Sequence, residues 1–275
     1  MTALSLPVES APAGEPGAVS HPRVVFEVCV LAWRNLVKFS RNPRLMVLST
    51  IQPVAQLILF AYVFNGIAHV QGVSYREFVI PAVLIQAVTL SAMRTGVAVA
   101  DDLDSGMIDR FRTLPIARSA VLVGRTVSDT LRLALQSFLL MMIALLIGFD
   151  FREGVLPAAG VFFVVVSFGV AFTAFAGWVG LRVRDPETAQ TALLVPVLPL
   201  VFTSSAFSPI SRLPGFMQGV ARWNPVTAAV DTSRSLALGG PLLVPFLHFV
   251  AWIIAITVVF TTLGVRRYRR AATGV

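Results

Sequence analysis

Charged side chains are scarce in this sequence. Only 13% of the 275 residues are Asp, Glu, Lys or Arg, whereas 56% are hydrophobic and the mean hydropathy is +0.80. A soluble domain carries about 25% charged residues, because its surface must be solvated. A chain with so few charges is surrounded mostly by lipid, so the composition excludes an ordinary soluble protein and predicts an integral membrane protein.

Cysteine and lysine each occur once. A single cysteine, Cys29, makes no intrachain disulfide and no cysteine-based metal site, and the three histidines are scattered along the chain. A P-loop needs a lysine after glycine to reach nucleotide phosphates, but Lys38 follows Val37. We therefore expect no cofactor and no metal on this chain, and any ATPase that acts with it must be a separate polypeptide.

Acidic residues are missing from the middle of every long apolar segment, because all 14 fall in the N-terminal tail, in connecting segments or at segment ends. Proton-coupled transporters usually keep an ionisable group inside the membrane. This absence weighs against a proton antiporter, while a sodium-coupled mechanism stays open. The sequence also has no HExxH or GxSxG motif and no pair of carboxylates within an apolar segment, so a membrane hydrolase would have no catalytic residues.

Six apolar segments dominate the chain, and each is about long enough to cross a bilayer as a helix. We place them near residues 45–66, 78–100, 131–149, 155–181, 190–207 and 242–265. In the fourth, Gly169, Thr173 and Gly177 recur every four residues and predict a flat face for close helix packing. The predicted fold class is an all-α integral membrane protein with six transmembrane helices.

Basic residues predict the orientation of these helices. With both termini inside, fifteen Lys and Arg lie in the inner segments and five in the outer segments, which is a strong positive-inside bias. The net charge of +8 is distributed between the apolar segments and does not form one stripe. This favours contact with anionic membrane lipid over nucleic acid. We predict a multi-pass protein of the plasma membrane with cytoplasmic N and C termini.

Two segments precede the first span. Residues 1–22 are rich in Ala, Pro, Gly and Ser and lack the basic start and apolar core of a signal peptide, so they predict a disordered cytoplasmic tail. Residues 23–41 place charged residues one or two helical turns apart, and Trp33 suits the headgroup layer. They predict an amphipathic helix, either lying in the membrane interface or extending the first span into the cytosol.

Uncharged polar side chains are rare inside the predicted spans. Gln52 and Gln56 lie one turn apart in the first span, and Gln86 and Thr89 lie in the middle of the second. Such side chains either hydrogen-bond between helices or line part of a transport pathway. Interhelical bonding is the more usual role, and we keep all four as candidate pathway residues.

Two arginines also lie within predicted spans, Arg94 in the second and Arg132 in the third. A long basic side chain near the end of a span snorkels to the surface or pairs with an acid, and Asp101 and Asp129 are the nearest acids in the sequence. Contact with a substrate is the alternative role. Arg94 is therefore the fifth candidate pathway residue.

The inner loop between the second and third spans, residues 101–125, reads DDLDSGMIDRFRTLPIARSAVLVGR. Acidic residues at its start and basic residues further on suit the dipole of a short cytoplasmic helix that Pro115 terminates. Apolar residues stand among these charges and favour contact with a protein partner. They are Met107, Ile108, Phe111 and Leu114.

The outer loop between the fifth and sixth spans, residues 207–240, reads FSPISRLPGFMQGVARWNPVTAAVDTSRSLALGG. It is too long for a hairpin turn and too apolar for a disordered segment. Residues 215–223 predict a short helix. Asn224 as cap and Pro225 at the first helical position start a second helix, which stops at the Gly239-Gly240 pair. We expect two short amphipathic helices that dip back toward the membrane.

These two loops, with RDPETAQ before the fifth span, resemble the ABC-2 type permease family, and within it the daunorubicin-resistance exporters of actinobacteria. The resemblance runs from about residue 23 to residue 270. It implies a permease subunit of an ATP-driven exporter that moves an amphipathic drug, antibiotic or lipid out of the cell. A working exporter of this kind has two permease chains, identical or different, and two ATPase chains.

The resemblance also implies roles for particular residues. The 104–115 segment matches the coupling helix that contacts the ATPase, with Asp104, Gly106, Asp109, Arg110, Phe111, Arg112, Leu114 and Pro115 as candidate residues. The 208–238 segment matches a re-entrant extracellular helix pair that closes the outer end of the pathway, with Pro209, Pro214, Trp223, Asn224, Pro225, Asp231 and Arg234 as candidate gate residues. A secondary transporter without an ATPase and a membrane scaffold without transport remain the alternatives.

Overall fold

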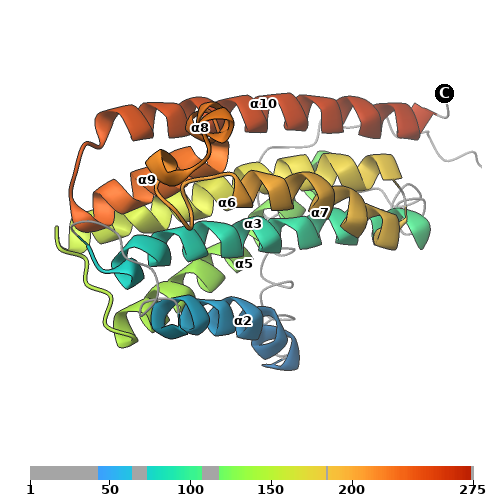
Figure 1. Cartoon of the computed structure of the whole chain (residues 1–275). Helices are drawn as coiled ribbons and strands as arrows, with labels where there is room; N and C mark the ends of the chain where they lie inside the picture. Colours follow the sequence, from blue (N-terminus) through green and yellow to red (C-terminus); the bar gives the residue numbers. More distant parts are fainter. Residues whose placement is uncertain (1–42, 64–72, 107–117, 184, 274–275) are drawn as a thin grey trace, which may run out of the picture.

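The computed structural model describes residues 43–63, 73–106, 118–183 and 185–273, and these fold into helices (Figure 1). A helix is present at each of the six predicted spans. The elements are α2 (Pro43–Ile58) with its π-helical continuation η1 (Leu59–Val63), α3 (Tyr75–Asp104), α5 (Arg118–Leu146), α6 (Val155–Val183), α7 (Pro186–Phe202), the short η3 (Ile210–Arg212), α8 (Gly215–Arg222), α9 (Pro225–Leu238) and α10 (Leu243–Thr273). The predicted tail and the amphipathic segment 23–41 lie outside the described residues.

Four of these helices are long and apolar enough to cross a membrane: α3, the part of α5 from Arg125, α6, and α10 as far as Arg266. The apolar parts of the first and fifth predicted spans are shorter helices, Ile51–Val63 and Pro186–Phe202. A bilayer core of about 30 Å needs about 20 helical residues. The described chain therefore has the helices of a membrane protein, with four of full spanning length.

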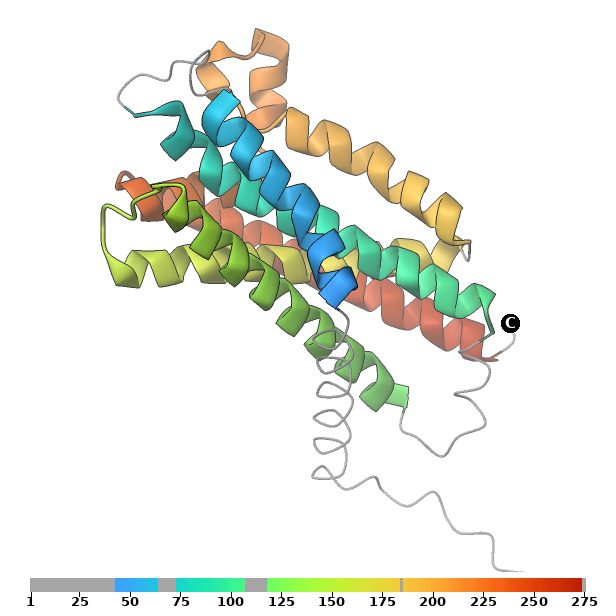
Figure 2. The same cartoon turned by 90° about the horizontal axis from the view of Figure 1, so that it is seen from below.

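Helix α3 forms the centre of the bundle. It contacts α6, α7, α5, α9 and α2, and its apolar residues are almost all buried (Figures 1 and 2). The helix begins with a capping box, in which Ser74 accepts a hydrogen bond from the Glu77 amide and the Glu77 carboxylate accepts one from the Ser74 amide. Because this box satisfies two backbone donors, the start of α3 is well defined.

The closest helix contact joins α3 to α6. A Cβ atom added at Gly96 would lie 2.4 Å from the carbonyl oxygen of Ala176, and one added at Gly180 would lie 2.2 Å from the carbonyl oxygen of Gly96. Only glycine permits this approach. The predicted flat face on α6 is correct at Gly169, which packs against α3 and α5, but wrong at Gly177, where none of the described residues of another helix lies within 4 Å of an added Cβ atom.

The two ends of the bundle carry different loops (Figure 2). One end carries the end of α3, the α6–α7 connection and the C-terminal end of α10. The opposite end carries the start of α3, the α5–α6 turn and the α9–α10 turn. Helices α3, α6 and α10 thus run in one direction and α5 and α7 in the other, and α7 is followed at this second end by η3, α8 and α9. This grouping places the two loops singled out in the sequence at opposite ends of the molecule.

Candidate functional site

The start of the inner loop is the part of the candidate coupling segment that the structure describes. Asp104 is the exposed last residue of α3, and Gly106 has a φ of +66°, the left-handed conformation in which helices often end. An ion pair between Asp102 of α3 and Arg125 of α5 joins the two helices beside this loop. The other candidate residues, Asp109 to Pro115, lie outside the described residues.

Two of the candidate pathway residues contact each other, one from α2 and one from α3. The Gln56 amide donates a hydrogen bond of 2.8 Å to the Gln86 side-chain oxygen. Gln86 and Thr89 are both buried, and the Thr89 hydroxyl donates to the backbone oxygen of Ile85. Gln52 is exposed on α2. These contacts match the interhelical role for Gln56 and Gln86, and a pathway role for the four residues stays a prediction.

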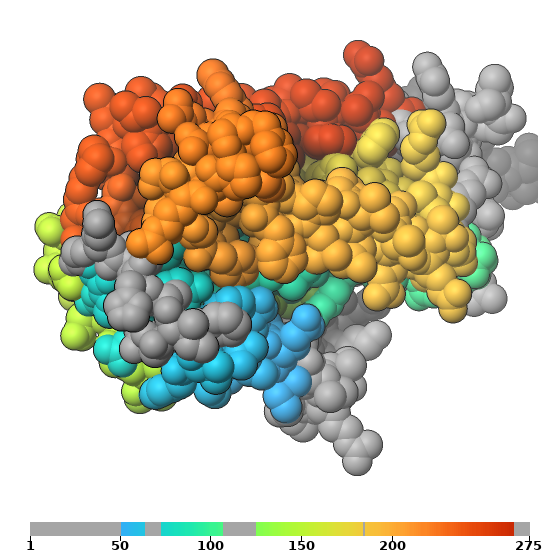
Figure 3. Space-filling model, viewed as in Figure 1, coloured from blue at the N-terminus to red at the C-terminus, as the bar shows by residue number. Residues whose placement is uncertain are grey.

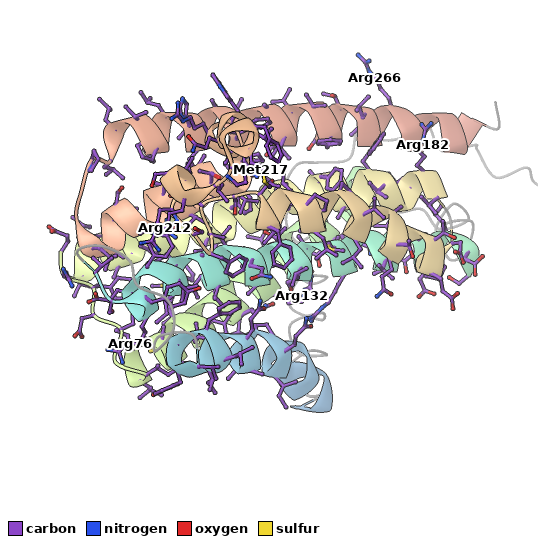
Figure 4. The ribbon with its side chains drawn as sticks, viewed as in Figure 1. Arg76, Arg132, Arg182, Arg212, Met217 and Arg266 are labelled. Atoms are coloured by element: carbon purple, nitrogen blue, oxygen red, sulfur yellow. The ribbon has the colours of Figure 1, made fainter. Side chains whose placement is uncertain are left out.

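Polar residues of α3 and α5 form a second group, which we call the inner basic cluster: Ser91, Arg94 and Thr95 from α3, and Asp129, Arg132 and Gln136 from α5. Arg132 lies near the middle of the bundle (Figure 4) and donates to the Ser91 backbone oxygen and to the Thr95 hydroxyl, both at 3.3 Å. The two arginines were identified from the sequence, but Ser91, Thr95 and Gln136 were not. Such side chains are common in helices, and only the contact between them in the folded structure distinguishes these three.

Arg234 is the central residue of an outer cluster, which we define as Phe78, Ser205, Thr227, Asp231 and Arg234. Its Nε donates to the backbone oxygen of Phe78 at 3.0 Å, and its guanidinium lies 3.6 Å from the centre of the Phe78 ring. Its Nη2 donates to the backbone oxygen of Ser205 at 3.0 Å, and its Nη1 pairs with Asp231 at 3.1 Å. One side chain therefore connects α9 to the start of α3 and to the chain that follows α7.

Two further hydrogen bonds within the outer cluster also join α9 to the chain that follows α7. The Ser205 hydroxyl donates to Asp231 at 2.6 Å, and the Thr227 hydroxyl accepts from the Ser205 amide at 3.1 Å. Burial lowers the pKa of Arg234 to about 10, so the guanidinium stays protonated at neutral pH. Of the seven candidate gate residues, the structure thus brings Asp231 and Arg234 into one cluster.

Asn224 connects α9 to the end of α7. Its side-chain oxygen accepts a hydrogen bond from the Val226 amide at 2.8 Å, which is the predicted helix cap, and its amide nitrogen donates to the Leu200 backbone oxygen at 2.6 Å. Pro225 follows at the first helical position and is buried. The predicted helices of the outer loop are confirmed as α8 and α9, and the N-cap of α9 was predicted from the sequence.

The other candidate gate residues lie around α8. Pro209 and Pro214 precede η3 and α8 and make no side-chain cap. Trp223 is 70% exposed, and its ring lies 5.6 Å from that of His248 on α10. These three residues do not join the outer cluster, so the seven candidates do not form one group.

An apolar cavity of about 220 Å³ lies between α6, α7, α9 and α10. Its lining includes Phe172, Pro196, Pro225, Trp252 and Phe260. Helices α7, α8 and α10 meet on the face of the molecule drawn in Figure 3. A cavity with this lining suits an apolar ring or an acyl chain, because it offers contact surface and almost no polar group.

Comparison with known proteins gives the family. The family model of the ABC-2 type transporter matches residues 26–238. The chain belongs to the ABC-2 type transporter family. The match covers most of the chain and includes every element from α2 to α9.

Several relatives of this ABC-2 chain carry related names. It is 30% identical over 207 residues, 75% of this chain and 73% of the relative, to the daunorubicin resistance ABC transporter permease protein DrrB1 of Streptomyces coeruleorubidus. It is 24% identical over 99% of both chains to the probable doxorubicin resistance ABC transporter permease protein DrrC of Mycobacterium tuberculosis. Over 61% of this chain and 45% of the relative, it is 22% identical to the probable multidrug ABC transporter permease YbhR of Escherichia coli.

Proposed function

We propose that this chain is the membrane permease subunit of an ATP-driven exporter of amphipathic molecules. The match of the family model over residues 26–238 carries this proposal, and the relatives named as drug resistance permeases support it. The four long apolar helices agree with such a subunit. We assign six spans to α2 with η1, α3, α5, α6, α7 and α10, with α8 and α9 as a re-entrant pair at the outer side.

The exporter also needs an ATPase, because this chain has no lysine placed in a P-loop. We assign two ATPase subunits, which bind ATP and Mg²⁺, and a second permease chain. The contact with the ATPase is assigned to the segment from Asp104 to Pro115, which begins at the last residue of the central helix α3. A rigid central helix of 30 residues is well suited to transmit motion of this segment into the bundle.

The outer helix pair is assigned to closing the pathway on the outside. Its support is the geometry around Arg234 and Asn224, which connect α9 to α3 and to the end of α7. The substrate class is supported by the apolar cavity between α6, α7, α9 and α10 and by the relatives' names. An amphipathic drug, antibiotic or lipid places its apolar part against such a lining.

Affinity capture of the full-length tagged chain in a mild detergent tests this function. We expect an ABC ATPase subunit to accompany the wild-type chain and to be lost in Phe111→Asp and Arg110→Glu, which place acidic charge in the coupling segment. Arg182→Glu, a charge reversal of an exposed residue at the end of α6, is the control and should retain the ATPase. If the wild-type chain transports in cells yet carries no ATPase, it is a secondary transporter.

The orientation has a direct test, because the chain has a single cysteine. In a Cys29→Ser background, Ser211→Cys in the outer loop should react with a membrane-impermeant thiol reagent in intact cells. Glu187→Cys at the start of α7 should react only after the cells are opened. Both positions are exposed, so their accessibility depends on the side of the membrane. The opposite labelling pattern would invert the assigned topology.

A further inference from the structure

Helix α2 with its continuation η1 lies at the edge of the bundle, where α2 contacts α3 and α5 (Figure 1). Its buried residues recur at every fourth position and so lie on the face that packs on the bundle: Pro53, Leu57 and Ala61. Gln52, Ala55 and Leu59 are exposed, and they follow one another at intervals of three and four residues. Such intervals place them on one side of the helix, which we call the exposed face of α2.

Gln52 lies near the middle of the bundle along its length. Phe60, two turns further on, stacks against Phe207 of the outer loop, so α2 runs from the inner end toward the outer end. Gln56 bonds to Gln86, the twelfth residue of the 30-residue helix α3. Gln52 precedes Gln56 by one turn and so lies about 6 Å further toward the inner end, which is close to the centre of α3. In the proposed orientation this level is the core of the bilayer.

An amide at this depth needs a hydrogen-bond partner, because the bilayer core holds no water. Hydroxyl groups of the spans bond to the backbone of their own helix, as Thr89 does to Ile85 and Ser167 does to Phe163. Gln52 makes no such bond, and none of the described residues bonds to its side chain. Because the side chain is also exposed, a partner from outside this chain can reach it.

The residues beside Gln52 favour another helix over lipid as this partner. Ala55 is exposed one turn away, and its small side chain lets the backbone of a second helix approach closely. Leu59, which is 46% exposed, adds apolar surface one turn further on. A polar amide next to a small residue on one face is typical of contacts between transmembrane helices. Lipid chains have no group that bonds to an amide.

We propose that the exposed face of α2 contacts the same face of a second copy of this chain, with the two Gln52 amides hydrogen-bonded to each other across a two-fold axis. Both copies cross the membrane in the same direction, so their Gln52 side chains lie at the same depth. Glutamine is self-complementary, because each amide group donates to the oxygen of the other. The inference rests on the proposed function for the presence of a second permease chain, and it makes that chain identical to this one.

Disulfide cross-linking of the full-length chain in its membrane tests the contact. In a Cys29→Ser background, which removes the single cysteine, Gln52→Cys should form a covalent dimer on mild oxidation, because a disulfide needs Cα atoms within about 7 Å. Val258→Cys is the matched control. It is 56% exposed in the middle of α10, so it lies at a similar depth on another helix, and it should stay monomeric.

Self-association of the purified full-length chain in phosphatidylcholine vesicles tests the amide, by energy transfer between labelled copies at increasing lipid dilution. Gln52→Leu should weaken dimerisation by about three- to thirtyfold, the range for amide bonds between helices in membranes. Gln52→Asn keeps an amide and should restore part of the loss. Gln218→Leu is the control and should match the wild type, because the Gln218 amide already donates to the Leu213 oxygen of its own chain.

Two results would overturn the proposal. One is Gln52→Cys that stays monomeric on oxidation but reacts with a water-soluble maleimide, which would place Gln52 in a water-filled pathway. The other is dimerisation of Gln52→Leu as strong as that of the wild type. Because Gln52 bonds to none of the described residues, its replacement should leave the unfolding temperature unchanged. Capture of the ATPase does not depend on either result, so the two proposals fail separately.

Discussion

Removal of the Arg234 side chain should weaken the outer end of the bundle more than any change at the surface. Arg234 is 14% exposed and its partner Asp231 is 32% exposed. In Arg234→Met the carboxylate keeps its contact with Ser205 but loses its cation, and the backbone oxygens of Phe78 and Ser205 lose their donor. An unpaired buried charge is the dominant cost, because each neutral hydrogen bond contributes less.

Breaking a buried ion pair costs about 3–5 kcal/mol. Since the carboxylate of Asp231 is partly exposed, solvent reduces its part of the cost, and we expect the low end, about 3 kcal/mol. Arg234→Lys keeps the charge but has one nitrogen in place of the guanidinium fork. It cannot reach Phe78, Ser205 and Asp231 together, and we expect a loss of about 1–2 kcal/mol from the missing hydrogen bonds.

Denaturant unfolding of the purified chain in a mild detergent measures these losses. Arg222→Met, an exposed residue at the end of α8 in the same loop, is the matched control and should leave the free energy of unfolding within about 0.5 kcal/mol of the wild type. The double variant Asp231→Asn with Arg234→Met should be more stable than Arg234→Met alone, because no charge is left unpaired. An Arg234→Met chain as stable as the control would refute the central role of Arg234.

Two further predictions concern helix contacts. Gly96→Ala places a Cβ atom 2.4 Å from the Ala176 carbonyl oxygen and should lower the free energy of unfolding by about 1–3 kcal/mol. Gly177→Ala, which has no atom of another described helix within 4 Å of the new Cβ atom, should instead raise the free energy of unfolding by up to about 1 kcal/mol. Equal effects at both positions would contradict the close contact. For the 2.8 Å bond between Gln56 and Gln86, a double-mutant cycle with leucine at each position should give a coupling of about 0.6 kcal/mol, and zero coupling would argue against the bond.

Local features of the sequence predicted much of the fold. Long apolar runs gave the positions of α3, α6 and α10; the bounds of α3 and α6 extend at most four residues past the predicted spans, and α10 extends eight residues past the predicted end. Asn224 and Pro225 predicted the start of α9, because a capping side chain and a fixed proline φ act within one helical turn. The helix that contains the third span, α5, begins at Arg118, ahead of the predicted span boundary at residue 131. Polar residues there pair with α3, and the apolar pattern alone did not show them.

Contacts between distant residues could not be predicted in this way. The bond from Arg234 to Phe78 joins residues 156 positions apart, and the approach of Gly96 to Gly180 joins two helices. In the sequence, the regular spacing of Gly169, Thr173 and Gly177 on one helix is a visible small-residue pattern. No such spacing connects Gly180 with Gly96, because these two glycines lie on different helices. The helix rotation that brings Gly180 to Gly96 depends on the whole bundle, so the spacing on one helix indicates a packing face without identifying its closest contact.

The polar contacts that join α2 and α9 to the central helix differ in expected strength. Helix α2 is bonded to the central helix through Gln56 and Gln86, with an expected coupling of about 0.6 kcal/mol. Loss of Arg234, which bonds α9 to the same helix, is expected to cost about 3 kcal/mol. Apolar packing adds to the first contact, because Leu57 and Ala61 of the first predicted span are almost completely buried. Since Gln86 and Thr89 are buried in the bundle, they can line a pathway only if helices separate, and a movement of α2 away from α3 would have to break the Gln56–Gln86 bond and uncover these apolar side chains.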